Sequence, residues 1–269
     1  MRTGSDVTEL PIQPQGRTLR LLSLNIQVGL NSSRDHHLLT HAWRHAVPTR
    51  AARQHLDRIA TLAGQYDVVA LQEADAGSLR TVQLNQVAHL AEQAGFPHWQ
   101  AAVTRDLRPF AQHCLGCLSR WPLESITQHA LPGWPRGRGA LDVVIRPDGH
   151  GPLRLIVVHL ALGRRTRARQ FDYLAGLVQA EADTVVLGDL NCGMSELEAH
   201  ASLRASGLRS VHGQPSFPSW RPLLALDHML VSPGIEVIHS SVVDERVSDH
   251  LPVATEIRLR GGTFIGSGA

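Results

Sequence analysis

Short apolar runs, separated by polar segments, recur along most of the chain, and they restrict the fold more than any other feature. Runs of about four to eight residues rich in Val, Leu and Ile are typical of buried strands. We expect strands at residues 19–25, 68–72, 115–119, 141–146, 153–160, 184–187, 226–232 and 252–257. The chain is therefore predicted to fold around β-sheets.

Helical periodicity is clearest where apolar residues return every three or four positions, at residues 49–63, 78–94 and 165–182. The middle of the chain instead has consecutive strands with no helix between them. Such an order favours hairpins over a purely parallel sheet. We predict an α/β fold, a four-layer α/β/β/α sandwich of two mixed β-sheets flanked by helices.

The length of 269 residues fits one such domain, because sheet-rich α/β folds reach about 250 residues around one core. Residues 1–18 are polar and contain prolines without apolar periodicity, which predicts a loose leader. We expect the folded domain at 19–260 and a C-terminal tail at 261–269.

The composition is that of a soluble globular protein, with 43% hydrophobic and 19% charged residues. All 26 basic residues are Arg, which offers a planar fork to phosphate, although a GC bias of the genome is the favoured explanation of this usage. Three cysteines and no secretion-signal pattern predict a reduced, cytoplasmic setting. No apolar run approaches the roughly 18 residues of a membrane span.

Several apolar runs end in a polar residue that can carry chemistry. Asn25, Glu73 and His159 each close one run, and Asp189 and Asn191 close another. A buried amide or carboxylate is costly unless it is satisfied, so repeated interruptions at comparable positions call for a common explanation. We expect these side chains to converge on one site.

These residues lie in the motifs SLN, LQE, VHL, GDLN, LDHMLVS and SDHLPV, which occur in that order. Together the motifs resemble those of the endonuclease/exonuclease/phosphatase superfamily, which has the DNase I-like fold, and the match covers residues 19–259. The resemblance implies a metal-dependent hydrolase that cleaves phosphodiesters or phosphomonoesters by in-line attack of an activated water. Magnesium is the implied metal, with Mn²⁺ as a substitute.

The resemblance implies that Glu73 is the main carboxylate ligand of the magnesium ion, with Asn25 beside it and Asp249 able to contribute. This set agrees with the chemistry of Mg²⁺, which prefers oxygen ligands and keeps several waters.

The resemblance also implies the catalytic groups. His250 is expected to contact the scissile phosphate and Asp227 to orient its imidazole. Asp189 is expected to orient or deprotonate the attacking water, Asn191 to hydrogen-bond the water or a phosphate oxygen, and His159 to stabilise charge on the phosphate.

Two clusters leave alternatives open. A row of histidines at a four-residue spacing suggests either a zinc site or a polar loop, and arginines after the VHL motif suggest either substrate binding or a solvated helix face. The residues are His37, His41 and His45, and Arg164, Arg165, Arg167 and Arg169.

The substrate is predicted to be a phosphorylated molecule: a nucleic acid, a lipid head group or a small phosphoester. The low aromatic content of 4% and the net charge of +2 argue mildly against an extended nucleic-acid groove. We expect a monomer. A non-specific nuclease, or a catalytically silent phosphate-binding module on the same fold, is the alternative.

Overall fold

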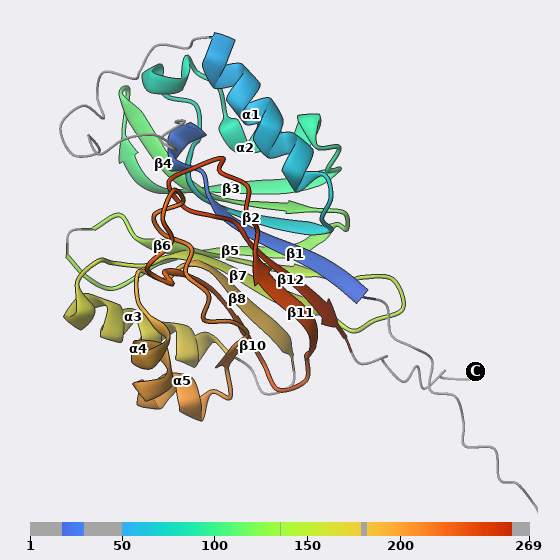
Figure 1. Ribbon diagram of the computed structural model, residues 1–269, viewed down its shortest axis with the longest axis vertical. Helices are drawn as coiled ribbons and strands as arrows, with labels where there is room; N and C mark the ends of the chain where they lie inside the picture. Colours follow the sequence, from blue (N-terminus) through green and yellow to red (C-terminus); the bar gives the residue numbers. More distant parts are fainter. Residues whose placement is uncertain (1–17, 30–49, 135, 179–181, 260–269) are drawn as a thin grey trace, which may run out of the picture.

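The computed structural model describes residues 18–29, 50–134, 136–178 and 182–259 (Figure 1). The predicted C-terminal tail and His37, His41 and His45 lie outside these residues, as does the predicted leader up to residue 17. No helix of the described part is long and apolar enough to cross a membrane.

One six-stranded sheet brings together strands from both ends of the described chain. β1 lies between β12, with which it is antiparallel, and β2, with which it is parallel. In spatial order the strands are β11 (Glu236–Val242), β12 (Val253–Arg258), β1 (Thr18–Asn25), β2 (Val68–Asp75), β4 (Ala111–Ser119) and β3 (His98–Leu107).

The other six-stranded sheet is formed by the middle of the chain. Only β7 and β8 pair in parallel, and the crossover between them contains a helix, as is usual for parallel strands. In spatial order the strands are β5 (Leu123–Ala130), β6 (Gly139–Ile145), β7 (Leu153–His159), β8 (Asp183–Asp189), β10 (Asp227–Val231) and β9 (Arg209–Ser210).

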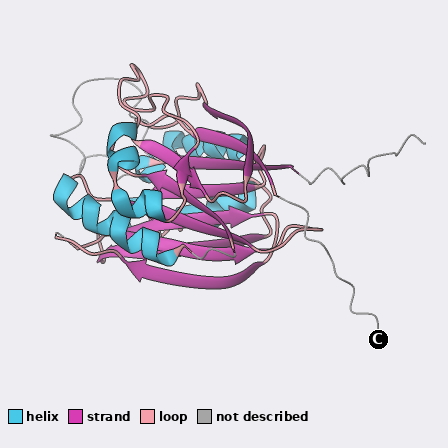
Figure 2. Cartoon of the chain, turned by 90° about the horizontal axis from the view of Figure 1, so that it is seen from below, coloured by secondary structure: helices cyan, strands magenta, loops and turns pink. Residues whose placement is uncertain are grey.

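Helices cover the outer face of each sheet. α1 (Arg50–Ala63) and α2 (Gln86–Gln93) lie on the first sheet, whereas α3 (Arg164–Leu177), α4 (Met194–Ala199) and α5 (Ala201–Ala205) lie on the second (Figures 1 and 2). The two sheets face each other, so the layer order is α/β/β/α. The predicted four-layer sandwich of two mixed sheets is confirmed.

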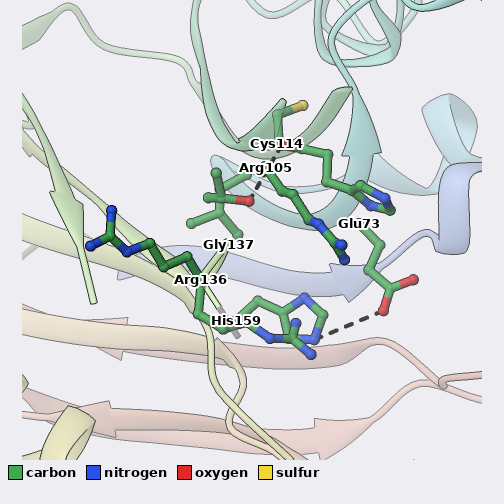
Figure 3. A pocket seen from close by; sticks show the side chains of 10 residues that line it. Glu73, Arg105, Cys114, Arg136, Gly137 and His159 are labelled. Atoms are coloured by element: carbon green, nitrogen blue, oxygen red, sulfur yellow. Dashed lines mark hydrogen bonds and ion pairs between the residues drawn. The ribbon is translucent and has the colours of Figure 1, made fainter. Parts of the chain in front are cut away.

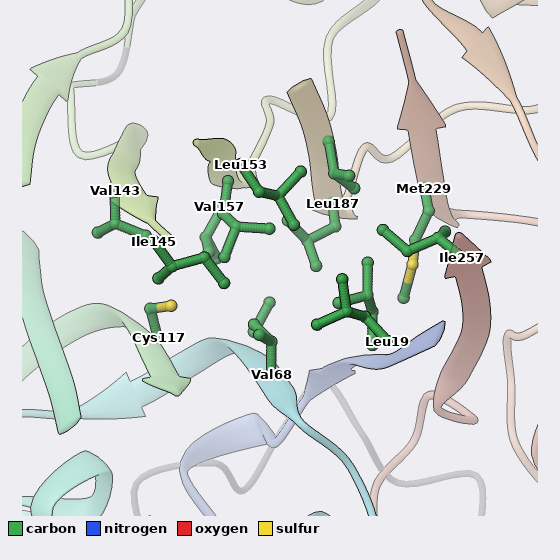
Figure 4. Packing of buried hydrophobic residues seen from close by; sticks show 14 of the residues in the cluster. Leu19, Val68, Cys117, Val143, Ile145, Leu153, Val157, Leu187, Met229 and Ile257 are labelled. Atoms are coloured by element: carbon green, nitrogen blue, oxygen red, sulfur yellow. The ribbon is translucent and has the colours of Figure 1, made fainter. Parts of the chain in front are cut away.

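Hydrophobic packing follows these layers. Apolar side chains from both sheets interdigitate between them, as Figure 4 shows for Leu19 and Val68 on one side and Val157 and Leu187 on the other. Separate clusters fill the space beneath each helical layer. Both faces of the central strands are therefore buried, and polar residues at their ends stand out as exceptions.

The predicted helix at 78–94 is wrong in its first half. The helix α2 begins only after Asn85, whose side chain accepts hydrogen bonds from the backbone of Val87 and Ala88. The preceding residues form a short 3₁₀ turn, and Val82 and Gln83 have positive φ angles that end it. The predicted helix at 165–182 also stops earlier, because Val178 is extended.

Candidate active site

Three strands from the two sheets end close to one another. Asn25 is the last residue of β1, His159 the last of β7 and Asp189 the last of β8. Because β7 and β8 are parallel and in register, His159 lies directly opposite Asp189. The sheets pack with the β1 end facing the β8 end, which brings Asn25 into hydrogen-bond contact with Asp189.

Asp189 lies at the centre of this group and is almost fully buried. One of its oxygens, Oδ2, accepts a hydrogen bond from Asn25 Nδ2 at 3.2 Å and lies 3.5 Å from His159 Nε2. The same oxygen is 4.0 Å from His250 Nε2. Its other oxygen, Oδ1, accepts from the backbone N–H of Asn191 at 2.9 Å.

Burial raises the pKa of Asp189 to about 7, and the charge of Asp227 acts in the same direction. A carboxylate with a pKa near neutrality has the basicity of an effective proton acceptor at the pH of the cell. The pKa of Asp189 therefore suits a general base better than that of an ordinary surface aspartate does.

Asp227 and His250 form a buried pair beside Asp189. His250 Nδ1 lies 2.7 Å from Asp227 Oδ2, which also accepts a hydrogen bond from Ser216 Oγ at 2.6 Å. The imidazole packs against the ring of Phe217, with 4.7 Å between centroids. Asp227 therefore fixes the imidazole so that Nε2 points toward Asp189.

Burial alone favours the neutral imidazole of His250. The charge and hydrogen bond of Asp227, together with the charges of Asp189 and Asp249, outweigh it and raise the pKa of His250 to about 10. His250 is thus protonated and presents the N–H of Nε2 on the side of the site where Asp189 lies.

His159, unlike His250, is neutral. Burial lowers the pKa of His159 well below its usual range, and the positive charges of Arg138 and His250 lower it further. Its Nε2 lies 3.8 Å from Glu73 Oε1 and 3.5 Å from Asp189 Oδ2. Glu73 and Asp189 are thus the acidic neighbours of His159. The sequence names both as site residues but does not show that they lie beside this histidine.

Glu73 is placed by an irregularity in β2. The pairing of β2 with β4 shifts register between Leu71 and Ala74, and Glu73 has a φ of 54°, which is uncommon for a residue with a side chain. The bulge turns the Glu73 side chain, which is 32% exposed, toward His159. Asn191 also has a positive φ, of 53°. Such backbone strain gathers at functional sites.

The expected metal ligands fit a divalent cation. Partial burial raises the pKa of Glu73, and repulsion from Asp249 raises it further. Burial also raises the pKa of Asp249. Asn25 lies in the same region, since its Nδ2 donates to Asp189, and its amide oxygen accepts from the backbone N–H of Gln27 with one lone pair left for a cation. Two carboxylates that disfavour each other's charge, together with an amide oxygen, are the kind of donor set that Mg²⁺ neutralises.

A different buried group also has the spacing of a cation site. One ligand atom each from Asp189, Asp227 and His250 lies within 4.8 Å of the others. However, the Asp227 oxygen and the His250 nitrogen that face each other are already hydrogen-bonded. The proton held by His250 disfavours a cation at this group.

The arginines after the VHL motif divide into two kinds. Arg164, Arg165 and Arg169 are exposed on α3. Arg167 is buried and donates to the Glu196 carboxylate and to the carbonyls of Ala161 and Leu162. The Arg167 guanidinium thus ties α3 to α4 and to the chain segment that follows His159.

A pocket of about 210 Å³ opens beside Glu73 and His159 (Figure 3). Sequence patterns missed most of its lining, because these residues do not close apolar runs. Arginines supply much of its charge, and Arg138 lies near enough to Asp189 and Glu73 to feel both charges. The lining residues are Glu73, Thr104, Arg105, His113, Cys114, Leu115, Arg136, Gly137, Arg138 and His159.

Comparison with solved structures shows the same fold. An endonuclease/exonuclease/phosphatase from Beutenbergia cavernae superposes with a TM-score of 0.73 at 23% identity, over 90% of this chain and 72% of that one. ANGEL2, a 2′,3′-cyclic phosphatase, gives 0.65 at 15% identity over 91% and 96% of the chains. A humanized D. rerio TDP2 gives 0.65 at 16% identity over 90% and 99%.

A search of curated protein sequences gave no match. The family model for the Endonuclease/Exonuclease/phosphatase family, however, matches residues 22–250. This span includes Asn25, Glu73 and His159, and it extends through Asp189 to His250. The chain therefore belongs to the endonuclease/exonuclease/phosphatase family.

Proposed function

We propose that the chain is a Mg²⁺-dependent phosphoesterase that hydrolyses a phosphodiester or phosphomonoester by in-line attack of water. One observation carries this proposal. Asp189, a buried carboxylate with a pKa near 7, lies within 4.0 Å of the protonated His250. A base and a proton donor held side by side, with an oxygen-rich cation site nearby, fit phosphoryl transfer.

Asp189 is the proposed base. It takes a proton from water as the water oxygen bonds to phosphorus and the ester P–O bond breaks on the opposite side. Asn25 and the backbone N–H of Asn191 hold the carboxylate in place. Asn191 Nδ2 donates to the Leu160 carbonyl at 3.0 Å, which orients the amide for contact with the water or a phosphate oxygen.

The two histidines have different proposed roles. His250, held protonated by Asp227, donates from Nε2 to a phosphate oxygen and offsets the charge that develops there. His159 is neutral, so it contributes one N–H donor or one acceptor rather than a charge.

Glu73, with Asn25 and Asp249, is the proposed magnesium site. When bound, Mg²⁺ supplies Lewis-acid neutralisation of the phosphate oxygens. The charge of Asp249 that raises the pKa of Glu73 supports this assignment, because a cation relieves the same repulsion. Mn²⁺ is expected to substitute.

The relatives support the reaction class. One solved structure of ANGEL2, a 2′,3′-cyclic phosphatase, is a complex with adenosine-2′,3′-vanadate. The present chain shares that fold and belongs to a family named for phosphoester-cleaving enzymes. We expect it, too, to act on a phosphorylated substrate.

The test is hydrolysis of bis(p-nitrophenyl) phosphate by the purified chain with Mg²⁺, with EDTA and with Glu73→Gln. We expect activity that requires Mg²⁺ and falls by at least about 100-fold in the variant, because the main carboxylate ligand is lost. Activity that survives both EDTA and Glu73→Gln would reject the magnesium mechanism. Binding of phosphate without hydrolysis of any ester would favour a silent module.

A further inference from the structure

The pocket beside Glu73 is strongly basic. Arg105, Arg136 and Arg138 line it, whereas Glu73 is the only acidic residue in its described lining. Arg136 and Arg138 flank a glycine in the segment between β5 and β6, and Arg105 comes from β3 of the other sheet. The pocket therefore lies where the two sheets meet, with positive charge supplied from both.

These arginines lack the partners that other arginines of the chain have. Arg154 pairs with Asp142, and Arg167 pairs with Glu196. Within the described ranges, by contrast, no carboxylate forms an ion pair with any of the three pocket arginines. Arg105 and Arg136 are exposed, whereas Arg138 is half-buried. Burial lowers the pKa of Arg138 although the charges of Asp189 and Glu73 oppose it, so a bound anion would stabilise its guanidinium further.

The shape of the loop holds the arginines at the pocket. Gly137 has a φ of 118°, and a Cβ there would lie only 3.0–3.1 Å from the side-chain carbons of Arg105. Glycine thus lets the loop pack directly on the stem of Arg105. Figure 3 shows Arg105 extending across the pocket in the direction of Glu73 and His159, whereas Arg136 extends the other way.

The positive field of the pocket affects its other side chains. His113, on β4, also lines it. Burial and the charges of Arg80, Arg105 and Arg138 lower the pKa of His113 to about 4, although Asp75 opposes them. His113 is therefore neutral at pH 7, and the arginines provide the charge of the pocket.

The pocket is smaller than the sites that enclose whole drug-sized ligands. Its volume of about 210 Å³ is below the roughly 300–1,000 Å³ that enclose drug-sized ligands. Glu73 and His159 also line the pocket, so it continues directly from the place proposed for the scissile phosphate. It has room for one further anionic group of the same molecule.

We propose that Arg105 and Arg138 form a subsite for a second phosphate group of the substrate, adjacent to the scissile phosphate. This inference rests on the proposed function. Arginine forks bind phosphate through paired charge-assisted hydrogen bonds. The subsite therefore selects substrates with two phosphates, such as a nucleic-acid backbone or a bisphosphorylated small head group.

The first experiment measures binding without turnover. Inorganic pyrophosphate and inorganic phosphate are titrated calorimetrically into chelator-treated wild type, Arg105→Ala, Arg138→Ala and the control Arg108→Ala. Arg108 is exposed, lies near the end of β3 and pairs with Asp106. We expect pyrophosphate to bind about tenfold more weakly to Arg105→Ala and Arg138→Ala than to wild type, and Arg108→Ala to match wild type.

The second experiment measures kcat/KM with Mg²⁺ on matched substrates. The dinucleotide TpT is compared with 5′-phosphorylated pTpT, and inositol 1-phosphate with inositol 1,4-bisphosphate. We expect wild type to prefer the two-phosphate member of one pair, which identifies the source of the second phosphate. Arg105→Ala should reduce that preference about tenfold. Arg105 is exposed, so this variant is expected to fold.

The outcomes separate the two proposals. If wild type hydrolyses these esters but Arg105→Ala and Arg138→Ala leave the preference unchanged, the subsite is overturned and the phosphoesterase stands. An equal loss on TpT and pTpT also overturns it, because the arginines then serve the scissile phosphate. If no ester is hydrolysed while pyrophosphate binding still depends on both arginines, the proposed function fails and the anion site stands.

Discussion

The buried side chain of His212 leads to a specific prediction about stability. His212 packs against β10, the strand that carries Asp227. Its ring stacks on that of His228 in β10, with 5.8 Å between centroids, and it is 8% exposed. Burial and the charge of His228 lower the pKa of His212 to about 4, although the charge of Asp227 and a hydrogen bond with its backbone oppose them.

The sign of the effect follows from this lowered pKa. A histidine in an unfolded chain has a pKa of about 6.5. Between pH 4 and pH 6.5, His212 is therefore protonated in the unfolded chain but mostly unprotonated in the folded chain. Stability therefore falls as the pH drops through this window. The shift of about 2.5 units corresponds to about 3 kcal/mol in full, of which about 2 kcal/mol is lost by pH 5.

The perturbation is His212→Phe, which keeps a ring but does not titrate. Urea unfolding at pH 7.5 and pH 5 gives the loss of stability for each protein, and the variant's own packing cost cancels between the two pH values. We expect wild type to lose about 2 kcal/mol more than the variant. His239→Phe, at an exposed position of β11, controls for the loss of a histidine. Equal losses in wild type and His212→Phe would refute the reasoning.

Two substitutions test the geometry of the site itself. Asp227→Asn removes the charge that keeps His250 protonated, and we expect kcat on bis(p-nitrophenyl) phosphate to fall by about 10³–10⁴, as when a triad aspartate is neutralised; a loss below tenfold, with the circular dichroism spectrum unchanged, would contradict this role. Gly188→Ala puts a Cβ 2.0 Å from the Val158 carbonyl oxygen at a φ of 148°. We expect it to cost about 3 kcal/mol in urea unfolding. Gly193→Ala, with nothing within 4 Å, is the control, and equal effects of the two would argue against the close approach of β7 and β8.

The central strands could be predicted from sequence because both of their faces are buried, which gives continuous apolar runs. β3, β5, β9 and β11 are absent from the predicted strands for the opposite reason, since most or all of their residues are exposed or half-buried and break the apolar pattern. The start of α2 was misplaced because residues 78–84 include apolar positions at helical spacing. The positive φ angles of Val82 and Gln83 that prevent a helix there leave no sequence signal.

The residues of the candidate site likewise fall into two groups: those that end an apolar run, and those that no sequence pattern marks. Asn25, His159 and Asp189 could be predicted because each interrupts an apolar run at its end. Ser216, which donates to Asp227, lies in a loop with no such pattern. Arg138 precedes Gly139, which pairs with His159, so the strand pairing within the second sheet, and no sequence pattern, brings Arg138 near Asp189.

The central claim is that the cation belongs to Glu73, whereas Asp189 accepts a proton from water and the pair of Asp227 and His250 binds a phosphate oxygen. Mn²⁺ binding, followed by electron paramagnetic resonance in wild type, Glu73→Gln and Asp227→Asn, tests it most directly. The account predicts that Glu73→Gln weakens Mn²⁺ binding by about tenfold or more, because a charged oxygen ligand is lost, while Asp227→Asn stays within a few-fold of wild type. Strong binding in Glu73→Gln and its loss in Asp227→Asn would place the metal at the other group and contradict the account.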